Sequence, residues 1–276
     1  MSQTDGASTY PPAQHILRDL RLTVEHRPDG TSTGWMPANP QLCNPSGSPR
    51  AGVLAILVDV VGGGLAAVAA QPDWIATADL TLHLAPRPVH GEIEAVGRVL
   101  RRGRTTVVAE VLLHERDGES LGIATMSFAV LPRRAGNLTI EQVDHVNRMT
   151  MATSDSGLKE PFRDRVALSV IDPDAGAVEL PLSSYVMNSL GSIQGGMVAA
   201  AADAAAEHAL AGACGGSVEI CDLQITYLAL AKVGPVRTEA RVLEATTEFG
   251  TAHVEIFDTG SQHRLTTTAR AVAVRA

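Results

Sequence analysis

Two aspartates each lie alone in a long apolar segment of the sequence. Asp59 is the only charged residue in 51–70, and Asp203 is the only one in 195–206. An ionised carboxylate that is buried without a partner is strongly destabilising. A solvent-exposed edge or a buried donor would explain one such residue. Here, however, each aspartate follows an asparagine by fifteen residues and a small residue at the start of the segment by eight. Two aspartates at equivalent positions favour a functional carboxylate.

The surroundings of both aspartates suggest acid–base chemistry at a carbonyl group. Each apolar segment follows a glycine-containing loop, and a helix that begins there offers unpaired N–H groups and a partial positive charge. Such donors form an oxyanion hole when they point at a carbonyl oxygen. Residues eight apart lie about 12 Å apart along a helix, so each aspartate would serve a carbonyl held by the other segment. A carboxylate in an apolar cleft has a raised pKa, which makes it a better base for water near neutral pH.

An internal duplication relates the two aspartates. At an offset of 144, residues 44–59 align with 188–203 without a gap, and six of these sixteen positions are identical, the two aspartates among them. An offset of 143 aligns DLTLHL (79–84) with DLQITY (222–227). This period is far longer than that of a solenoid repeat, so we expect two copies of one domain.

Each copy is predicted to contain one long helix and a set of strands. The segments 51–70 and 195 to about 211 are too long and too rich in alanine for strands, so we expect helices. The first helix is apolar almost all round and must therefore be wrapped by other elements. Runs rich in valine, threonine and isoleucine follow it, separated by turn signals, and they predict an antiparallel meander and an α+β fold class. These runs are 75–85, 91–101, 105–115 and 121–131.

The polarity of the chain outside these elements sets the predicted domain boundaries. We expect a disordered N-terminus over 1–14 and an N-terminal domain over 15–131. The more polar stretch 132–158 is predicted to be a connector with one short helix, and 159–276 to be the C-terminal domain.

Two other interpretations of the first apolar segment are disfavoured. It is long enough to span a bilayer, but Asp59 lies near its centre and three consecutive glycines follow. Gly62, Gly64 and Ala67 have the spacing of a dinucleotide-binding turn. The second copy lacks that spacing, and the chain beyond it is predicted to form strands rather than βαβ units.

The composition of the chain argues against several classes of binding partner. The 22 Lys and Arg against 30 Asp and Glu give a net charge of −8, which argues against a nucleic-acid partner. Aromatic residues make up only 3%, so platforms for stacking bases are scarce. Three cysteines do not form a disulfide framework, and the N-terminus lacks the pattern of a signal peptide. We therefore expect a cytoplasmic protein without a membrane partner.

The repeated pattern N-x-x-G-x-x-x-[GA]-G-x6-D, followed by D-L-x-[LI]-x-[LY] and a meander, resembles the PaaI-like branch of the hotdog-fold acyl-CoA thioesterases. The resemblance covers most of both copies. It implies two tandem hotdog domains, each a curved antiparallel sheet around a central helix, paired as an intramolecular pseudodimer. It also implies a hydrolase that converts an acyl-CoA thioester to free acid and coenzyme A without a metal or redox cofactor.

The resemblance further implies the roles of individual residues. The helix aspartate would act as general base or nucleophile, and the small residue at the helix start would polarise the thioester carbonyl through its N–H, aided by the upstream asparagine. A serine or threonine shortly before the post-helix aspartate would position the water. One site would combine Asp59 and Thr77 with Asn188 and Gly195, and the other Asp203 with Asn44 and Ala51, with Ile220 at the threonine position.

Both copies depart from the family where it usually has a histidine before the glycine pair, because Arg50 and Gln194 stand there. We expect unequal sites, of which the first is the more complete. The asparagines could also be turn formers, and Thr77 could be an ordinary strand threonine. Two rival functions are a non-catalytic acyl-CoA-binding protein and a hotdog hydratase or dehydratase, which would use a catalytic histidine that neither helix carries at the matching place. We also expect the double-hotdog chains to form a homo-oligomer.

Overall fold

The structure, a computed structural model, describes residues 10–116, 118–133 and 144–276. Two twenty-residue helices dominate it, α2 (Ala51–Ala70) and α4 (Gly195–Cys214). The first helix has the predicted bounds. The second begins where predicted and extends three residues beyond the expected end. The shorter helices are α1 (Ile16–Asp19), the 3-10 helix η1 (Pro40–Leu42) and α3 (Phe162–Arg165).

In the described part of the chain, thirteen strands form one antiparallel sheet. Their order across the sheet is β7-β1-β2-β4-β5-β6-β3-β10-β13-β12-β11-β9-β8. The first seven are β1 (Thr23–His26), β2 (Thr31–Pro37), β3 (Trp74–Leu84), β4 (Glu92–Arg102), β5 (Thr106–Glu115), β6 (Ser120–Leu131) and β7 (Asn147–Thr150). The others are β8 (Ser169–Asp172), β9 (Ala177–Leu180), β10 (Val218–Tyr227), β11 (Val236–Ala245), β12 (Phe249–Asp258) and β13 (Arg264–Arg275).

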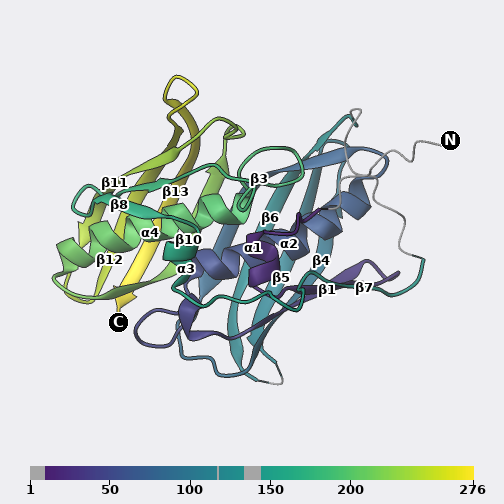
Figure 1. Cartoon of the computed structure of the whole chain (residues 1–276), viewed down its shortest axis with the longest axis horizontal. Coiled ribbons are helices and arrows are strands. Elements are labelled where there is room, and N and C mark those ends of the chain that lie inside the picture. The colour runs from purple at the N-terminus through teal and green to yellow at the C-terminus, as the bar shows by residue number, and fades with distance from the viewer. Residues whose placement is uncertain (1–9, 117, 134–143) are drawn as a thin grey trace.

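The two halves of the sheet meet where β3 pairs with β10, from Asp79 opposite Thr226 to His83 opposite Asp222. On either side of this seam the same elements follow in mirrored order, and each half places one long helix against its strands. Figure 1 shows α2 and α4 in neighbouring positions on the same side of the sheet. The repeated order is what an internal duplication predicts, whereas the boundaries of two tandem domains stay a prediction.

The meander prediction is correct for three strands of the first half and wrong for the fourth. β4, β5 and β6 are consecutive neighbours, but β3 pairs with β6 rather than with β4. The proline-rich segment 85–90 carries the chain from β3 to β4 at the far side of the half-sheet. β3 therefore lies at the seam, between β6 of its own half-sheet and β10 of the other half-sheet.

Helix α2 is covered on most of its surface. Strands β2 to β6 and helix α4 all contact it, and Val53, Ile56 and Val58 have no exposed surface. Among the described residues it is the one helix long and apolar enough to cross a membrane. In this structure the sheet and α4 cover that apolar surface, as the wrapped-helix prediction requires.

The long helices touch near their N-termini through glycine. A Cβ on Gly52 would lie 2.5 Å from Ala200 Cα, and a Cβ on Gly196 would lie 2.5 Å from Ile56 Cα. No side chain fits between backbones at that distance. The two contacts are symmetric, and they bring the first turn of each helix beside the second turn of the other.

Two predictions about the termini and the connector need correction. Residues 10–14 were expected to be disordered, yet Tyr10 donates a hydrogen bond to the Met187 carbonyl at 3.4 Å and Arg18 Nε donates to the Pro12 carbonyl at 2.6 Å. The described part of the connector, 144–158, contains strand β7 paired with β1 rather than a helix. The rest of the connector from 134 to 143 lies outside the described residues.

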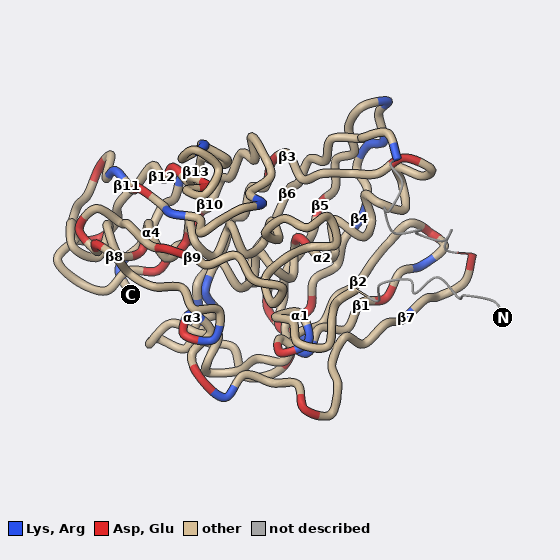
Figure 2. The backbone as a smooth tube through the Cα atoms, turned by 45° about the horizontal axis from the view of Figure 1, so that its top comes forward, with Lys and Arg blue, Asp and Glu red and all other residues tan. Residues whose placement is uncertain are grey.

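Charged residues of both signs are interspersed along the chain in Figure 2 rather than gathered by sign. The arginines at 101, 102 and 104 lie around the β4–β5 turn, and Arg102 Nε donates to the Ala69 carbonyl at 2.9 Å. This contact satisfies one of the carbonyls left unpaired at the end of α2.

Candidate active site

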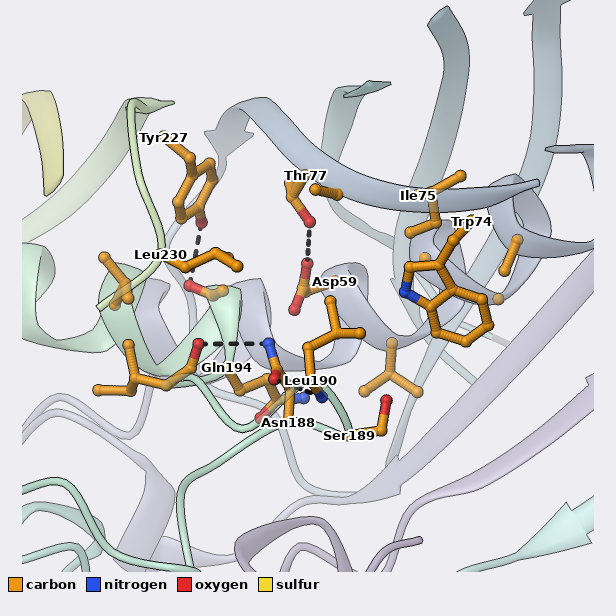
Figure 3. Close-up of a pocket in the computed structure, with 18 of the residues that line it drawn as sticks. Asp59, Trp74, Ile75, Thr77, Asn188, Ser189, Leu190, Gln194, Tyr227 and Leu230 are labelled. Atoms are coloured by element: carbon orange, nitrogen blue, oxygen red, sulfur yellow. Dashed lines mark hydrogen bonds between the residues drawn. The ribbon is translucent and has the colours of Figure 1, made fainter. Parts of the chain in front are cut away.

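Asp59 lies halfway along α2 and meets the first turn of α4. The Gly196 N–H donates to Asp59 Oδ2 at 3.2 Å, and Thr77 Oγ1 donates to Asp59 Oδ1 at 3.2 Å. Figure 3 shows Thr77 above the carboxylate. Three of the residues predicted for the first site, Asp59, Thr77 and Gly195, are therefore brought together. The aspartate of one helix faces the N-terminus of the other, as the spacing of eight residues predicts.

Burial changes the acidity of this carboxylate. Asp59 is only 9% exposed, and burial raises its pKa from 3.8 to about 6, although the N–H of Gly196 and the hydroxyl of Thr77 act against the rise. A carboxylate with a pKa near 6 is ionised at neutral pH and is a much stronger base than a solvated one. It can therefore accept a proton from water in a transition state.

Gly195 leaves room for the Asp59 carboxylate because it has no side chain. A Cβ at this position would lie 3.1 Å from both oxygens of Asp59, so any larger residue would press on the carboxylate. Tyr227 donates its hydroxyl to the Gly195 carbonyl at 3.0 Å. That carbonyl shares a peptide group with the Gly196 N–H, so the tyrosine hydrogen bond strengthens the donor that holds Asp59.

The loop before α4 is shaped by Asn188. Its side-chain oxygen accepts from the N–H of Leu190 at 2.9 Å and from the N–H and hydroxyl of Ser192 at 3.1 Å each. Its Nδ2 lies 3.5 Å from the Ile193 carbonyl. Asn188 lines the cavity beside Asp59, and these contacts give it the turn-forming role that the sequence left open.

Gln194 is a site residue whose role the sequence reasoning missed. It is 5% exposed, lines the cavity beside Gly195, and its Oε1 atom is buried without a hydrogen-bond partner. A buried amide with unused hydrogen-bonding capacity at a helix N-terminus can bind a polar ligand atom. Its position before the glycine pair was visible in the sequence, where it marked only a departure from the family pattern.

A cavity of about 590 Å³ extends from Asp59 between α2 and the strands around it. Its walls are mostly apolar, and Figure 3 shows Trp74 and Ile75 on one side. On α2 it follows one face of the helix, formed by Asp59, Val60, Gly63, Gly64 and Ala67. Nothing lies within 4 Å of a Cβ built on Gly63, so this glycine faces open space. The cavity can hold an extended apolar group whose polar end lies at Asp59.

The equivalent aspartate of the second half has a different environment. Arg163 lies 3.5 Å from Asp203 and pairs with Glu207, which also pairs with Arg50 at 2.7 Å. Burial raises the pKa of Asp203, while the Arg163 guanidinium acts against the rise. Two arginines and one glutamate thus fill the space beside this carboxylate.

Hydrogen bonds also tie together the loop before α2, which belongs to the second site. Glu219 is 5% exposed, and its carboxylate accepts hydrogen bonds from the hydroxyls of Ser46 and Ser48, the latter at 2.6 Å. Asn44 Nδ2 lies 3.3 Å from the Ser48 hydroxyl. Ile220, at the position equivalent to Thr77, is buried and offers no hydroxyl. Asp203, Asn44 and Ala51 do not line the cavity found at Asp59, and ion-paired side chains lie beside Asp203.

The aligned sequences of the two copies already contain part of the difference between the surroundings of Asp59 and Asp203. Gly63 and Gly64 of α2 align with Glu207 and His208 of α4. The helix face that lines the cavity in the first copy therefore carries a charged side chain in the second. The contribution of Arg163 has no local signal, because it reaches the site from a separate short helix. Among the described residues, no group of three or more histidine, cysteine or acidic side chains is placed to hold a metal ion.

Residues 190–263 match the family model of the thioesterase superfamily. This segment begins in the loop before α4 and ends after β12. No curated protein matches the sequence.

Solved structures of thioesterases share the fold over nearly the whole chain. An acyl-ACP thioesterase from Bacteroides thetaiotaomicron is similar with a TM-score of 0.59 and 14% identity over 89% of this chain and 98% of its own. A tesB protein from Mycobacterium avium has a TM-score of 0.62 and 12% identity over 88% and 92%. A 12:0-ACP thioesterase from Umbellularia californica has a TM-score of 0.59 and 10% identity over 88% and 94%. The chain has the mixed helix and sheet architecture of hotdog thioesterases.

Proposed function

We propose that this protein hydrolyses an acyl-CoA thioester to the free acid and coenzyme A at a single site around Asp59. One observation carries the proposal: a buried carboxylate with a raised pKa faces the N-terminus of α4 at the end of an apolar cavity. The thioesterase family match, which includes the α4 side of this site, supports the reaction class.

The mechanism follows from the donors and the base at this site. The thioester carbonyl oxygen would accept the Gly195 N–H at the start of α4, where the helix dipole favours the developing negative charge. Thr77 and Asp59 would hold a water on the other side of the carbonyl carbon. Asp59 takes one proton as the water oxygen bonds to that carbon. The tetrahedral intermediate then collapses, the carbon–sulfur bond breaks, and the proton on Asp59 passes to the departing thiolate.

The cavity accounts for the acyl part of the substrate, and coenzyme A is the carrier that the sequence resemblance implies. Two of the similar structures are described as acyl-ACP thioesterases, so acyl carrier protein is the alternative carrier. A comparison of one acyl chain on both carriers decides between them. Preferred turnover of the acyl-ACP would reject coenzyme A as the carrier and leave the hydrolytic site unchanged.

We further propose that the chain is a tandem double hotdog, with site residues drawn from both halves. The mirrored strand order and the reciprocal glycine contacts of α2 and α4 support this arrangement. The PaaI-like branch, a cytoplasmic location and a homo-oligomer of such chains are proposals that rest on the sequence. Size measurement in solution tests the last of them.

The experiment compares two aspartate variants that are equivalent by the internal duplication. Release of free thiol is followed over a panel of acyl-CoA substrates for the wild type, Asp59→Asn and Asp203→Asn. We expect the wild type to turn over at least one substrate and Asp59→Asn to lose roughly 10²–10⁴-fold in kcat/KM. Asp203→Asn should keep most of the activity, provided that it remains folded by circular dichroism. Undiminished turnover in Asp59→Asn would reject the assignment, and tight binding without turnover in the wild type would favour a non-catalytic binding protein.

A further inference from the structure

His26 is a polar side chain in the apolar part of the cavity, away from Asp59. It ends strand β1, lines the cavity, and packs over helix α2 at Gly64. A Cβ built on Gly64 would lie 2.5 Å from His26 Cε1, so this glycine is what lets the imidazole approach the helix. Gly64 is five residues after Asp59, which places the imidazole roughly 7.5 Å further along the helix axis.

The walls around this imidazole are apolar. The cavity residues contributed by the neighbouring segments include Leu17, Val24, Met149 and Met151. Among the described residues that line the cavity, none is lysine, arginine or glutamate, and Asp59 is the one carboxylate. The imidazole is therefore a hydrogen-bonding group in a lining that is mostly apolar and can hold a hydrocarbon chain.

The two ring nitrogens of His26 are not equivalent. Nδ1 is buried and has no hydrogen-bond partner, and no described residue forms a hydrogen bond with Nε2. Burial lowers the pKa of His26, so the ring is neutral at neutral pH and carries a single proton. Buried N–H groups without an acceptor are rarer than buried acceptors without a donor. The proton is therefore assigned to Nε2, which makes His26 a hydrogen-bond donor toward the cavity.

We infer that His26 binds an oxygen substituent, a hydroxyl or a keto group, on the acyl chain of the substrate. The inference rests on the proposed function, because it names the class of acyl chain that the site at Asp59 receives. An unsubstituted chain leaves the Nε2 proton without an acceptor in an apolar wall, whereas an oxygen at the right depth satisfies it. A site built to hydrogen-bond a substrate group discriminates against the analogue that lacks it.

The depth of His26 restricts where the oxygen can be. The helix rise of roughly 7.5 Å from Asp59 and carbon–carbon bonds of about 1.5 Å place the substituent roughly between the fifth and eighth carbons of an extended chain. Oxygen near the thioester, on the second or third carbon, would not reach the imidazole. The preference should therefore show a maximum along the chain rather than a general preference for polar acids.

The test measures binding of free acids, which requires no turnover. Calorimetry compares an unsubstituted medium-chain acid with the same acid hydroxylated at successive carbons, for the wild type and for His26→Phe. We expect the wild type to bind the best hydroxy acid about tenfold more tightly than the plain acid. His26→Phe keeps a ring of similar size but has no donor, so it should lose this preference while binding the plain acid at least as well. Val24→Ala, which changes the same cavity without removing a polar group, should keep the preference.

Three results would overturn the inference. They are equal binding of plain and hydroxylated acids by the wild type, a preference that is flat along the chain, and a preference that survives in His26→Phe. The position scan needs only the wild type, so it decides the question even where a variant does not fold. Measured in Asp59→Asn as well, the preference should persist, because that variant removes the base and leaves His26 in place. A hydroxyl preference without hydrolysis in the wild type would reject the proposed function and keep the inference about His26.

Discussion

Replacing Asp59 by asparagine should stabilise the protein while it lowers activity. Raising the pKa of a buried carboxyl from 3.8 to about 6 costs about 3 kcal/mol of folding free energy at neutral pH. The asparagine side chain has nearly the same shape as aspartate and carries no charge. Part of its amide faces the N–H of Gly196 and the hydroxyl of Thr77, which now donate to Asp59, and this mismatch costs about 1 kcal/mol. The net gain at pH 7.5 should be about 1–2 kcal/mol.

The gain should depend on pH with a definite sign. Between pH 3.8 and about 6 the folded wild type keeps the proton on Asp59, whereas the unfolded chain has released it. The native state therefore binds more protons, and wild-type stability falls as pH rises through this window. Asp59→Asn has no such dependence. The stability difference between the two proteins should grow by about 2 kcal/mol from pH 4.5 to pH 7.5.

Urea unfolding of both proteins at the two pH values measures this difference, and Asp258→Asn is the control of opposite sign. Asp258 is buried, and its carboxylate accepts the N–H groups of Lys232, Val233 and Gly234 at 2.7–3.1 Å. These hydrogen bonds hold the pKa of Asp258 below its ordinary value. Its stabilising effect is therefore present at pH 7.5 and declines in acid, and the variant should be less stable than the wild type by about 1–3 kcal/mol at pH 7.5. A pH-independent loss of stability in Asp59→Asn would refute the reasoning.

Four further outcomes follow from the same contacts. Thr77→Val removes a hydrogen bond to the Asp59 carboxylate, so the acidic limb of the kcat/KM profile, expected near pH 6 in the wild type, should move to higher pH. Gly195→Ala presses on that carboxylate and should lower kcat by about tenfold or more, as steady-state kinetics would show. Gly63→Leu fills open space in the cavity and should lower kcat/KM for long acyl chains far more than for short ones. Gly52→Val forces a side chain against the backbone of α4 and should reduce the unfolding free energy by about 1–3 kcal/mol, measured with urea.

The sequence was most informative where local pattern and duplication acted together. The helix over 51–70 and its partner from 195 are long and apolar, so their existence needed no tertiary information. The spacing of eight residues from each helix start to its aspartate predicted that Asp59 would face the start of the other helix, and the Gly196 N–H does bond to it. The pairing of β3 with β10 had no such signal, because it depends on how the two half-sheets meet. Tyr227 and His26 reach the cavity from strands distant in sequence, and only the assembled fold brings them there.

The surroundings of Asp59 and Asp203 differ because arginine side chains lie beside Asp203 only. Leu17 and Arg163 are the second residues of α1 and α3, and Gln194 and Arg50 directly precede α4 and α2. At Asp203 both arginines point into the space beside the carboxylate and pair with acidic side chains there. At Asp59 the corresponding leucine and glutamine line the cavity and bring no charge.

An aspartate that is buried without a cation keeps a raised pKa and leaves room for a substrate beside it. Burial raises the pKa of Asp203 as well, to about 6, so the two positions differ in the space beside the carboxylate, which Arg50, Arg163 and Glu207 occupy at Asp203. One duplicated position therefore lies beside an apolar cavity in one half and in an ion-pair network in the other. Each aspartate accepts a backbone N–H from the start of the other long helix, Asp59 from Gly196 and Asp203 from Gly52. The proposed hydrolysis at Asp59 therefore requires both helices, because α2 supplies the carboxylate and α4 the N–H donors.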